Sequence, residues 1–205
     1  MKIIKSATLD GIDAICVDVE ATFTKGLPTF TIVGMVNISI NESKDRVKSA
    51  LLTNEFKFPP LKITINLSPS EINKRGTHFD LAIALQIAFY NNTNLGLDEI
   101  FCFGELALNG EIKDTNSIFP IVLSLVKQGV LRKVLVCEES AKKLSIIPNL
   151  EIYCVKNLNS AMEFMKSSQK ENYLFKNIKL EFEELSINGQ IYYYDSNYKE
   201  DFKDV

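Results

Sequence analysis

The apolar residues of this chain follow two periods, which predict an alternation of strands and helices. Residues 2–8 and 12–23 have the pattern of strands, and Asp10-Gly11 between them is typical of a tight turn. Such alternation indicates α/β or α+β layers in a single domain. Further strands are expected at 30–33, 61–67, 133–137 and 151–155, and helices from about 39, at 79–90, from 116–117 to Gly129, at 139–144 and at 158–167.

Two of the predicted helices differ in the distribution of their apolar residues. The helix at 79–90 is apolar nearly all round, so we expect a central, buried helix. The helix that begins near Ser39 is amphipathic and places Ile40 and Val47 on one face. Ser39 and Glu42 have the spacing of a capping box, in which each side chain accepts a hydrogen bond from a free backbone N–H group.

The pattern changes at residue 168. We expect residues 1–167 to form the domain and residues 168–205 to form a linker, with a hairpin around Asn188-Gly189. The sequence shows no internal repeat and no low-complexity tract.

Composition limits the class of protein. A chain of 205 residues with 46% hydrophobic content can bury one substantial core. Its net charge of -3 gives no overall support to binding of nucleic acid or of an anionic membrane, although a local basic patch remains open. No apolar run is long enough to span a bilayer, and the first residues lack the apolar stretch of a signal peptide, so we expect a cytoplasmic protein.

The sequence offers few residues for metal, nucleophilic or nucleotide chemistry. None of the four cysteines belongs to a CxxC pair, and we expect buried free thiols. The single histidine, His78, leaves little for a zinc site or a Ser-His-Asp triad. A P-loop is absent, because no Gly-Lys-Ser/Thr occurs; the glycines Gly104 and Gly110 fit a strand and turn instead, with Asn109-Gly110 as a hairpin turn. The cysteines are Cys16, Cys102, Cys137 and Cys154.

Five segments stand in an order that rarely arises by chance. In this order they resemble the N-terminal domain of the magnesium-chelatase-like AAA+ ATPases, the ComM/YifB group, over roughly residues 4–166. The end of the chain, 201–205, resembles the segment that precedes the ATPase module in that family. The five segments are GLPTFTIVG at 26–34, NESKDRV at 41–47, INLSP at 65–69, KRGTHFDL at 74–81 and FGELALNG at 103–110.

The resemblance implies a fold and a lost active site. The family's N-terminal domain is similar to the proteolytic domain of Lon-type proteases and to the second domain of ribosomal protein S5. In that peptidase a serine at a helix N-terminus is activated by a lysine from the next helix. By this resemblance His78 stands in the serine's place and Phe119 in the lysine's. Phenylalanine accepts no proton, so we expect the catalytic dyad to be vacated.

Neighbouring residues could replace the dyad only in part. Thr77 offers a hydroxyl, and Lys113 or Lys74 offers a base, but we expect both lysines in solvated loops with ordinary pKa values. We expect His78 to be a partly exposed residue at a helix start, and Asp80 to be a charge that favours the helix dipole.

Lys74 and Arg75 are adjacent basic residues and are the strongest candidates for a local basic patch. Both precede the Gly76 turn, so we expect their side chains to be exposed at the mouth of the vacated cleft, as candidate DNA contacts.

Three functions follow as hypotheses. The first is a non-catalytic accessory domain of a ring-forming AAA+ ATPase. By resemblance the whole protein would migrate DNA branches in natural transformation, with ATP and Mg²⁺ in a missing module and further copies of itself as partners. The second is a degenerate Ser/Thr-Lys peptidase, which the missing lysine disfavours. The third is a stand-alone DNA- or protein-binding module, whose nucleic-acid form the near-neutral charge weakens.

Overall fold

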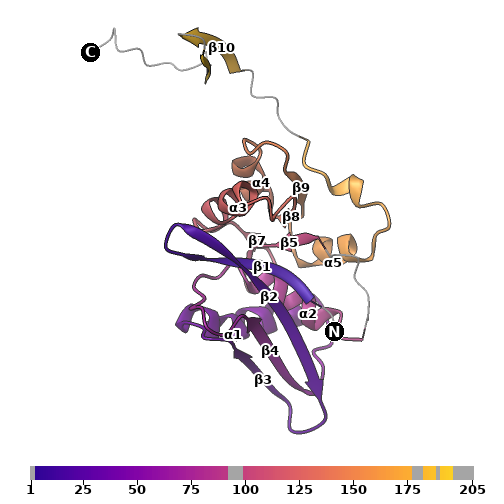
Figure 1. Cartoon of the computed structure of the whole chain (residues 1–205). Helices are drawn as coiled ribbons and strands as arrows, with labels where there is room; N and C mark the ends of the chain where they lie inside the picture. Colours follow the sequence, from indigo (N-terminus) through magenta and orange to yellow (C-terminus); the bar gives the residue numbers. More distant parts are fainter. Residues whose placement is uncertain (1–2, 92–98, 177–181, 188–189, 196–205) are drawn as a thin grey trace, which may run out of the picture. The chain divides into compact units, whose positions relative to one another are not determined.

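The computed structural model describes residues 3–91, 99–176, 182–187 and 190–195 (Figure 1). Two compact units make up the chain, Met1–Phe175 and Lys176–Val205. The second unit contains an antiparallel hairpin of β10 (Phe182–Ile187) and β11 (Gln190–Asp195), which confirms the hairpin predicted around Asn188-Gly189. Residues 188–189 themselves lie outside the described residues.

The first unit is built on a seven-stranded sheet in the order β3-β4-β2-β1-β5-β8-β9. Strands β1 and β2, and strands β2 and β4, pair antiparallel, while the other neighbours in this sheet pair parallel. A separate hairpin joins β6 to β7. The strands are β1 (Ile3–Asp10), β2 (Asp13–Thr24), β3 (Thr29–Val33), β4 (Lys62–Ser68), β5 (Ile100–Cys102), β6 (Glu105–Leu106), β7 (Ile112–Lys113), β8 (Lys133–Val136) and β9 (Glu151–Cys154).

Helices cover one face of this sheet along its whole width and the other face over only part of it. Alternate residues of each strand point to opposite faces. One face lies in a first hydrophobic core, and a second core covers the other face over β1, the start of β2, β5, β8 and β9. The end of β2, β3 and β4 present exposed or half-buried side chains on that second face. The helices of the first core are α1 (Ile38–Thr53), α2 (Asp80–Ala88) and α5 (Leu158–Lys166), and those of the second are α3 (Ile118–Lys127) and α4 (Glu138–Leu144). This arrangement confirms the α/β prediction, while the likeness to ribosomal protein S5 domain 2 and to Lon stays a prediction.

Helix α2 lies at the centre of the first core. Its residues from Asp80 to Ile87 are all buried, and Ile83 and Ile87 are fully so. The prediction of a central helix is therefore confirmed. The hairpin turn at Asn109-Gly110 is confirmed as well, because the chain reverses there between β6 and β7, with Gly110 at φ +86°.

The capping box predicted for α1 is wrong. The helix begins at Ile38, and its N-cap is Asn37, whose side chain accepts a hydrogen bond from the Ile40 N–H group at 3.2 Å. Ser39 is already inside the first turn and donates its hydroxyl to Asn37 Oδ1. Glu42 is exposed on the helix surface, where its carboxylate lies 3.9 Å from Arg46.

The compact unit also continues past the boundary predicted at 167/168. A 3-10 helix, Lys170–Tyr173, packs back on the domain, with the Tyr173 ring 5.3 Å from that of Phe164. The Phe175 N–H group then donates to Ile152 O at 2.8 Å. These contacts place residues 168–175 with the domain rather than with a linker.

Candidate functional site

The turn between β4 and α2, residues 69–79, contains Lys74, Arg75 and His78, three of the residues that the sequence analysis singled out. Lys74 is fully buried, and its hydrogen bonds hold the first part of the turn in place. The ammonium group donates to the carbonyl oxygens of Gly34, at 2.8 Å, and of Pro69. The backbone of Lys74 also bonds to the segment after β3, with Lys74 N donating to Met35 O and Asn37 N donating to Lys74 O.

The prediction of an exposed Lys74 is therefore wrong. A parallel bridge between Val36 and Lys74 extends the pairing of β3 and β4 and turns the lysine side chain into the protein. Both acceptors of its ammonium are backbone carbonyls, and burial lowers the pKa of this lysine. Lys74 thus acts as a cross-link between two loops and has no surface for DNA.

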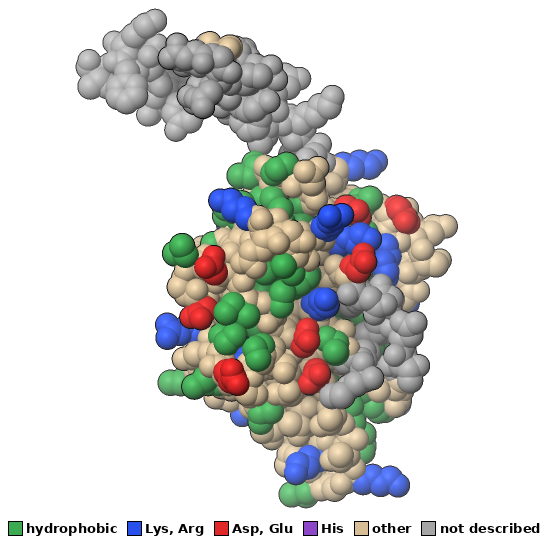
Figure 2. Space-filling model, viewed as in Figure 1, with side chains coloured by type: hydrophobic (Ala, Val, Ile, Leu, Met, Phe, Trp, Pro, Cys, Tyr) green, Lys and Arg blue, Asp and Glu red, His purple; other side chains and the backbone are tan. Residues whose placement is uncertain are grey.

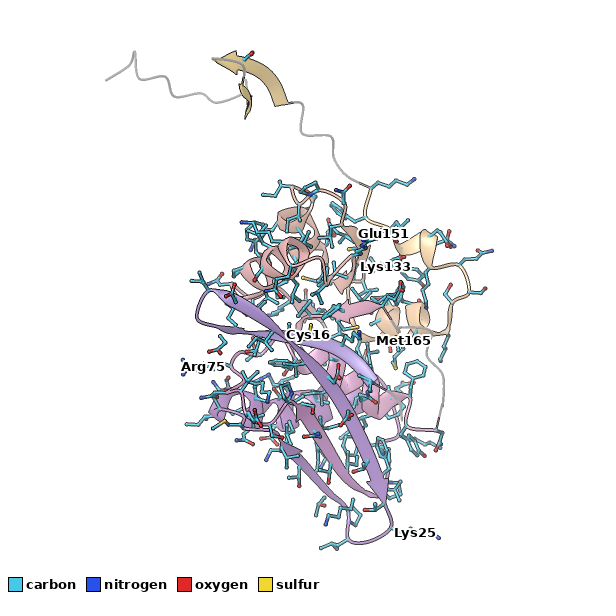
Figure 3. All side chains as sticks on the ribbon, in the orientation of Figure 1. Cys16, Lys25, Arg75, Lys133, Glu151 and Met165 are labelled. Atoms are coloured by element: carbon cyan, nitrogen blue, oxygen red, sulfur yellow. The ribbon has the colours of Figure 1, made fainter. Side chains whose placement is uncertain are left out.

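Arg75 behaves as predicted, with its side chain exposed to solvent. Figure 3 shows it extending away from the body of the domain. The next residue, Gly76, has φ +98°, and a Cβ atom there would lie 2.7 Å from His78 Nδ1. Glycine is therefore required, both for its backbone conformation and for the close approach of the imidazole.

His78 is fully buried, contrary to the prediction of a partly exposed residue. The reason is that α2 begins at Asp80, so His78 precedes the helix and its ring turns inward beneath β1. Its Nε2 lies 2.9 Å from the carbonyl oxygen of Ala7, and its Nδ1 lies 3.0 Å from the hydroxyl of Ser117. Because a carbonyl only accepts, the ring proton sits on Nε2, and Nδ1 accepts from Ser117. Burial lowers the pKa of His78 to about 4, so the ring is neutral at pH 7.

Phe119 is the residue expected in place of the lysine. It is half-buried in α3 and packs against the second core. The α3 side chain that contacts His78 is that of Ser117, the N-cap position of the helix. From the sequence we expected Ser117 only to begin a helix. It lies 39 residues from His78 along the chain, and no sequence pattern indicates that the two side chains meet.

The replacements considered for the dyad are not placed for catalysis. The Thr77 hydroxyl donates to the carboxylate of Glu105. Lys113 lines a different cavity, of about 760 Å³, together with Cys137 and Lys156. Lys74 is held by carbonyl groups, as described above. Among the residues that the structure describes, the turn therefore presents no nucleophile paired with a free base.

Asp80 is the first residue of α2, as predicted, and it is also half of an ion pair that the sequence did not reveal. Its carboxylate accepts hydrogen bonds from Arg46 Nε at 2.7 Å and Nη2 at 3.3 Å, and another from the Leu106 N–H group at 3.2 Å. Burial raises the pKa of Asp80, and the hydrogen bond from Arg46 opposes that shift. The pair joins α1 to α2 and to the β6–β7 hairpin.

A cavity of about 470 Å³ opens beside the turn. One wall comes from the β1–β2 hairpin, one from the turn itself and one from the start of α3. The lining of this cavity includes both an acidic residue, Asp10, and a basic residue, Arg75. The described part of the chain holds no group of three His, Cys, Asp or Glu side chains suited to a metal ion. The cavity is lined by Thr8, Leu9, Asp10, Gly11, Asn73, Arg75, Gly76, His78, Ser117 and Ile121.

The four cysteines are free thiols, as predicted, but only Cys102 and Cys137 are buried, while Cys16 and Cys154 are half-buried. Burial raises the pKa of Cys102 to about 12, so that thiol stays protonated. In the described ranges no helix combines the length and the apolar character needed to cross a membrane.

Comparison with known proteins gives a family match over more than half of the chain. Residues 19–140, which include the turn, Arg46 and Ser117, match the family described as subunit ChlI of Mg-chelatase. The chain belongs to this family.

Relatives of this ChlI-family chain extend the similarity over most of its length. It is 30% identical over 172 residues to Competence protein ComM of Haemophilus influenzae, covering 83% of this chain and 33% of that protein. It is 32% identical over 168 residues to YifB of Escherichia coli, covering 81% of this chain and 33% of that protein. To Rv2897c of Mycobacterium tuberculosis it is 27% identical over 165 residues, covering 80% and 33%. The chain thus spans about a third of the length of these relatives.

Proposed function

We propose that this chain is a non-catalytic accessory domain of a magnesium-chelatase-like AAA+ ATPase. The observation that carries the proposal is the state of His78. Both of its ring nitrogens are engaged, by Ala7 O and by Ser117 Oγ, and the ring is buried and neutral. By the family resemblance His78 stands where a peptidase would hold its nucleophile. Here its side chain instead links β1, the turn before α2 and the start of α3, which is a structural role.

In this proposal the chemistry of the whole protein belongs to another module. The 205 residues contain no Gly-Lys-Ser/Thr segment, so ATP and Mg²⁺ would bind elsewhere. One relative is named as a competence protein. Together with the family resemblance, this supports a DNA motor that migrates branches during natural transformation and works as a ring of identical copies.

The test compares two proteins from the same gene, the 205-residue chain and the product that continues through any segment encoded after Val205. ATP hydrolysis is measured for both with and without branched DNA, and branch migration is followed on a synthetic three-strand junction. We expect the longer product alone to hydrolyse ATP, to be stimulated by DNA and to move the junction. An ATP-inert longer product, or peptide hydrolysis by the shorter chain, would contradict the proposal.

A further inference from the structure

One end of the main sheet carries an exposed apolar residue between lysines. The loop from β2 to β3 contains Lys25, Gly26 and Leu27, and the Leu27 side chain is 82% exposed. Figure 3 places Lys25 at the extremity of this loop, and in Figure 2 that end of the domain shows blue and green side chains, with the red ones higher up. Leu27 belongs to the first of the five segments that carry the family resemblance, yet it contributes nothing to the core.

The pairing of the strands brings a second lysine to this loop. Lys62, the first residue of β4, is paired on one side with Thr24 and on the other with Thr29, the two residues that flank the loop. Lys25 follows directly after Thr24. Both lysines are exposed.

Hydroxyl groups form the next rows of the same sheet face. Thr24, Lys62 and Thr29 make the first row across the three strands, and Thr22, Thr64 and Thr31 make the second. Of these threonines, all but Thr64 are exposed. Lysine and threonine side chains are typical donors to phosphate oxygens. The third row contains Glu20, whose carboxylate accepts a hydrogen bond from Asn66.

Charge is distributed unevenly in this part of the chain. Residues 21–41 run from the end of β2 through the loop and β3 to the start of α1, and residues 56–70 contain the segment before β4 and β4 itself. Neither range contains an Asp or Glu. They do contain Lys25, Lys57 and Lys62, all exposed, in a protein with a net charge of -3. This end of the sheet is therefore a basic patch that the overall charge conceals.

We propose that this strand-end surface, made of Lys25, Leu27, Lys62, Thr24 and Thr29, binds DNA. The lysines and threonines contact the phosphates, and Leu27 packs against a base or inserts at a base step, as apolar side chains do in proteins that open or bend a duplex. The proposal rests on the proposed function, and it gives the domain's DNA contact to this surface instead of to Lys74.

The experiment measures affinity for a fluorescein-labelled DNA fork by fluorescence anisotropy over a series of salt concentrations, with the 205-residue chain and no ATP. Lys25→Ala/Lys62→Ala removes two phosphate contacts, so we expect the slope of log K against log salt to fall by about 1.8. Lys113→Ala/Lys127→Ala removes the same charge from exposed lysines elsewhere and should leave most of the slope in place.

A second pair of variants tests the apolar contact. Leu27→Ala should weaken fork binding by about fivefold to tenfold with an unchanged salt slope. Leu108→Ala, at a 59% exposed leucine in the β6–β7 turn, should leave the affinity unchanged. Thermal unfolding of each variant shows that the fold is kept, since none of these side chains is buried.

Three results of the DNA titrations would overturn the proposal. They are an unchanged slope in Lys25→Ala/Lys62→Ala, an equal fall in both double variants, and the absence of DNA binding by the wild type at low salt. Binding to phosphatidylcholine–phosphatidylserine vesicles in place of DNA, lost in Lys25→Ala/Lys62→Ala, would assign the surface to a membrane and overturn it as well. The ATPase test is separate, so DNA binding through this surface by a protein without ATPase activity would reject the proposed function alone.

Discussion

The hydroxyl of Ser117 lies 3.0 Å from Nδ1 of His78, and this hydrogen bond joins the start of α3 to the turn before α2. The opposite nitrogen of the ring bonds to Ala7 in β1, so one imidazole holds three elements together. Two of these elements belong to different faces of the main sheet. His78 therefore fastens the two layers of helices to each other through the sheet.

Replacing this ring should destabilise the domain. His78→Ala leaves a cavity, removes the Nε2 donor to the Ala7 carbonyl and removes one of the two partners of the Ser117 hydroxyl, so the free energy of unfolding should fall by about 3 kcal/mol. Ser117→Ala removes the hydrogen bonds of the hydroxyl with His78 Nδ1 and Thr115 Oγ1 and should cost about 1–2 kcal/mol. Urea unfolding followed by circular dichroism measures both. A His78→Ala protein as stable as the wild type would show that the ring is not a structural joint.

Stability should also depend on the protonation of His78. The folded-state pKa of about 4 lies below the ordinary value of 6.5, because the buried ring disfavours the charged form. The unfolded chain then binds the proton first, so the stability due to His78 is complete above pH 6.5 and is lost as the pH falls toward 4. The full effect is about 3 kcal/mol.

The control for this pH dependence is His78→Gln, which does not titrate. Carboxylates contribute similarly to both proteins, so the difference between their stability curves from pH 7 to pH 4.5 isolates the histidine. Parallel curves would mean that His78 has the same pKa in the folded and unfolded states.

Lys74 should matter for stability and Arg75 should not. Lys74→Met keeps much of the side-chain volume but leaves the Gly34 and Pro69 carbonyls without their donor, at a cost of about 2 kcal/mol. Arg75→Met changes an exposed side chain and should stay within about 0.5 kcal/mol of the wild type. Chemical denaturation of the two variants provides the comparison, and equal stabilities would contradict the internal role of Lys74.

The chain should not hydrolyse peptides, and restoring the residue types of the dyad should not change that. His78→Ser/Phe119→Lys places a serine and a lysine at the two positions, but Phe119 packs against the second core and lacks the surroundings that would position a base. A fluorogenic peptide assay is the measurement. Turnover by the wild type that is abolished by Thr77→Ala would show that the threonine is a nucleophile after all.

Much of the fold was predictable because it depends on local patterns. The all-round apolar character of residues 79–90 identified a central helix, and Asn109-Gly110 identified a hairpin. The N-cap of α1 was not predictable from the sequence, because the side chains of Asn37 and Ser39 can both accept a hydrogen bond from a backbone N–H group at a helix start. Only the structure shows that Asn37 accepts it and that Ser39 donates to Asn37.

The candidate site was less predictable, since its contacts join distant parts of the chain. Lys74 bonds to backbone carbonyls, which every residue possesses, so its sequence neighbours gave no sign of burial. The same holds for His78, whose partners come from β1 and from the start of α3. Arg46 and Asp80 carry opposite charges, but only the packing of α1 on α2 shows that they pair.

The Lys74 cross-link has a mechanical consequence for the far end of the sheet. Strands β3 and β4 run parallel and both start beside Leu27, at Thr29 and Lys62. They end next to Gly34 and Pro69, whose carbonyls share the ammonium of Lys74. A force applied at the β2–β3 loop is thus transmitted along the paired strands β3 and β4 to the Lys74 ammonium, which holds both strand ends. The turn that contains Lys74 leads directly into helix α2.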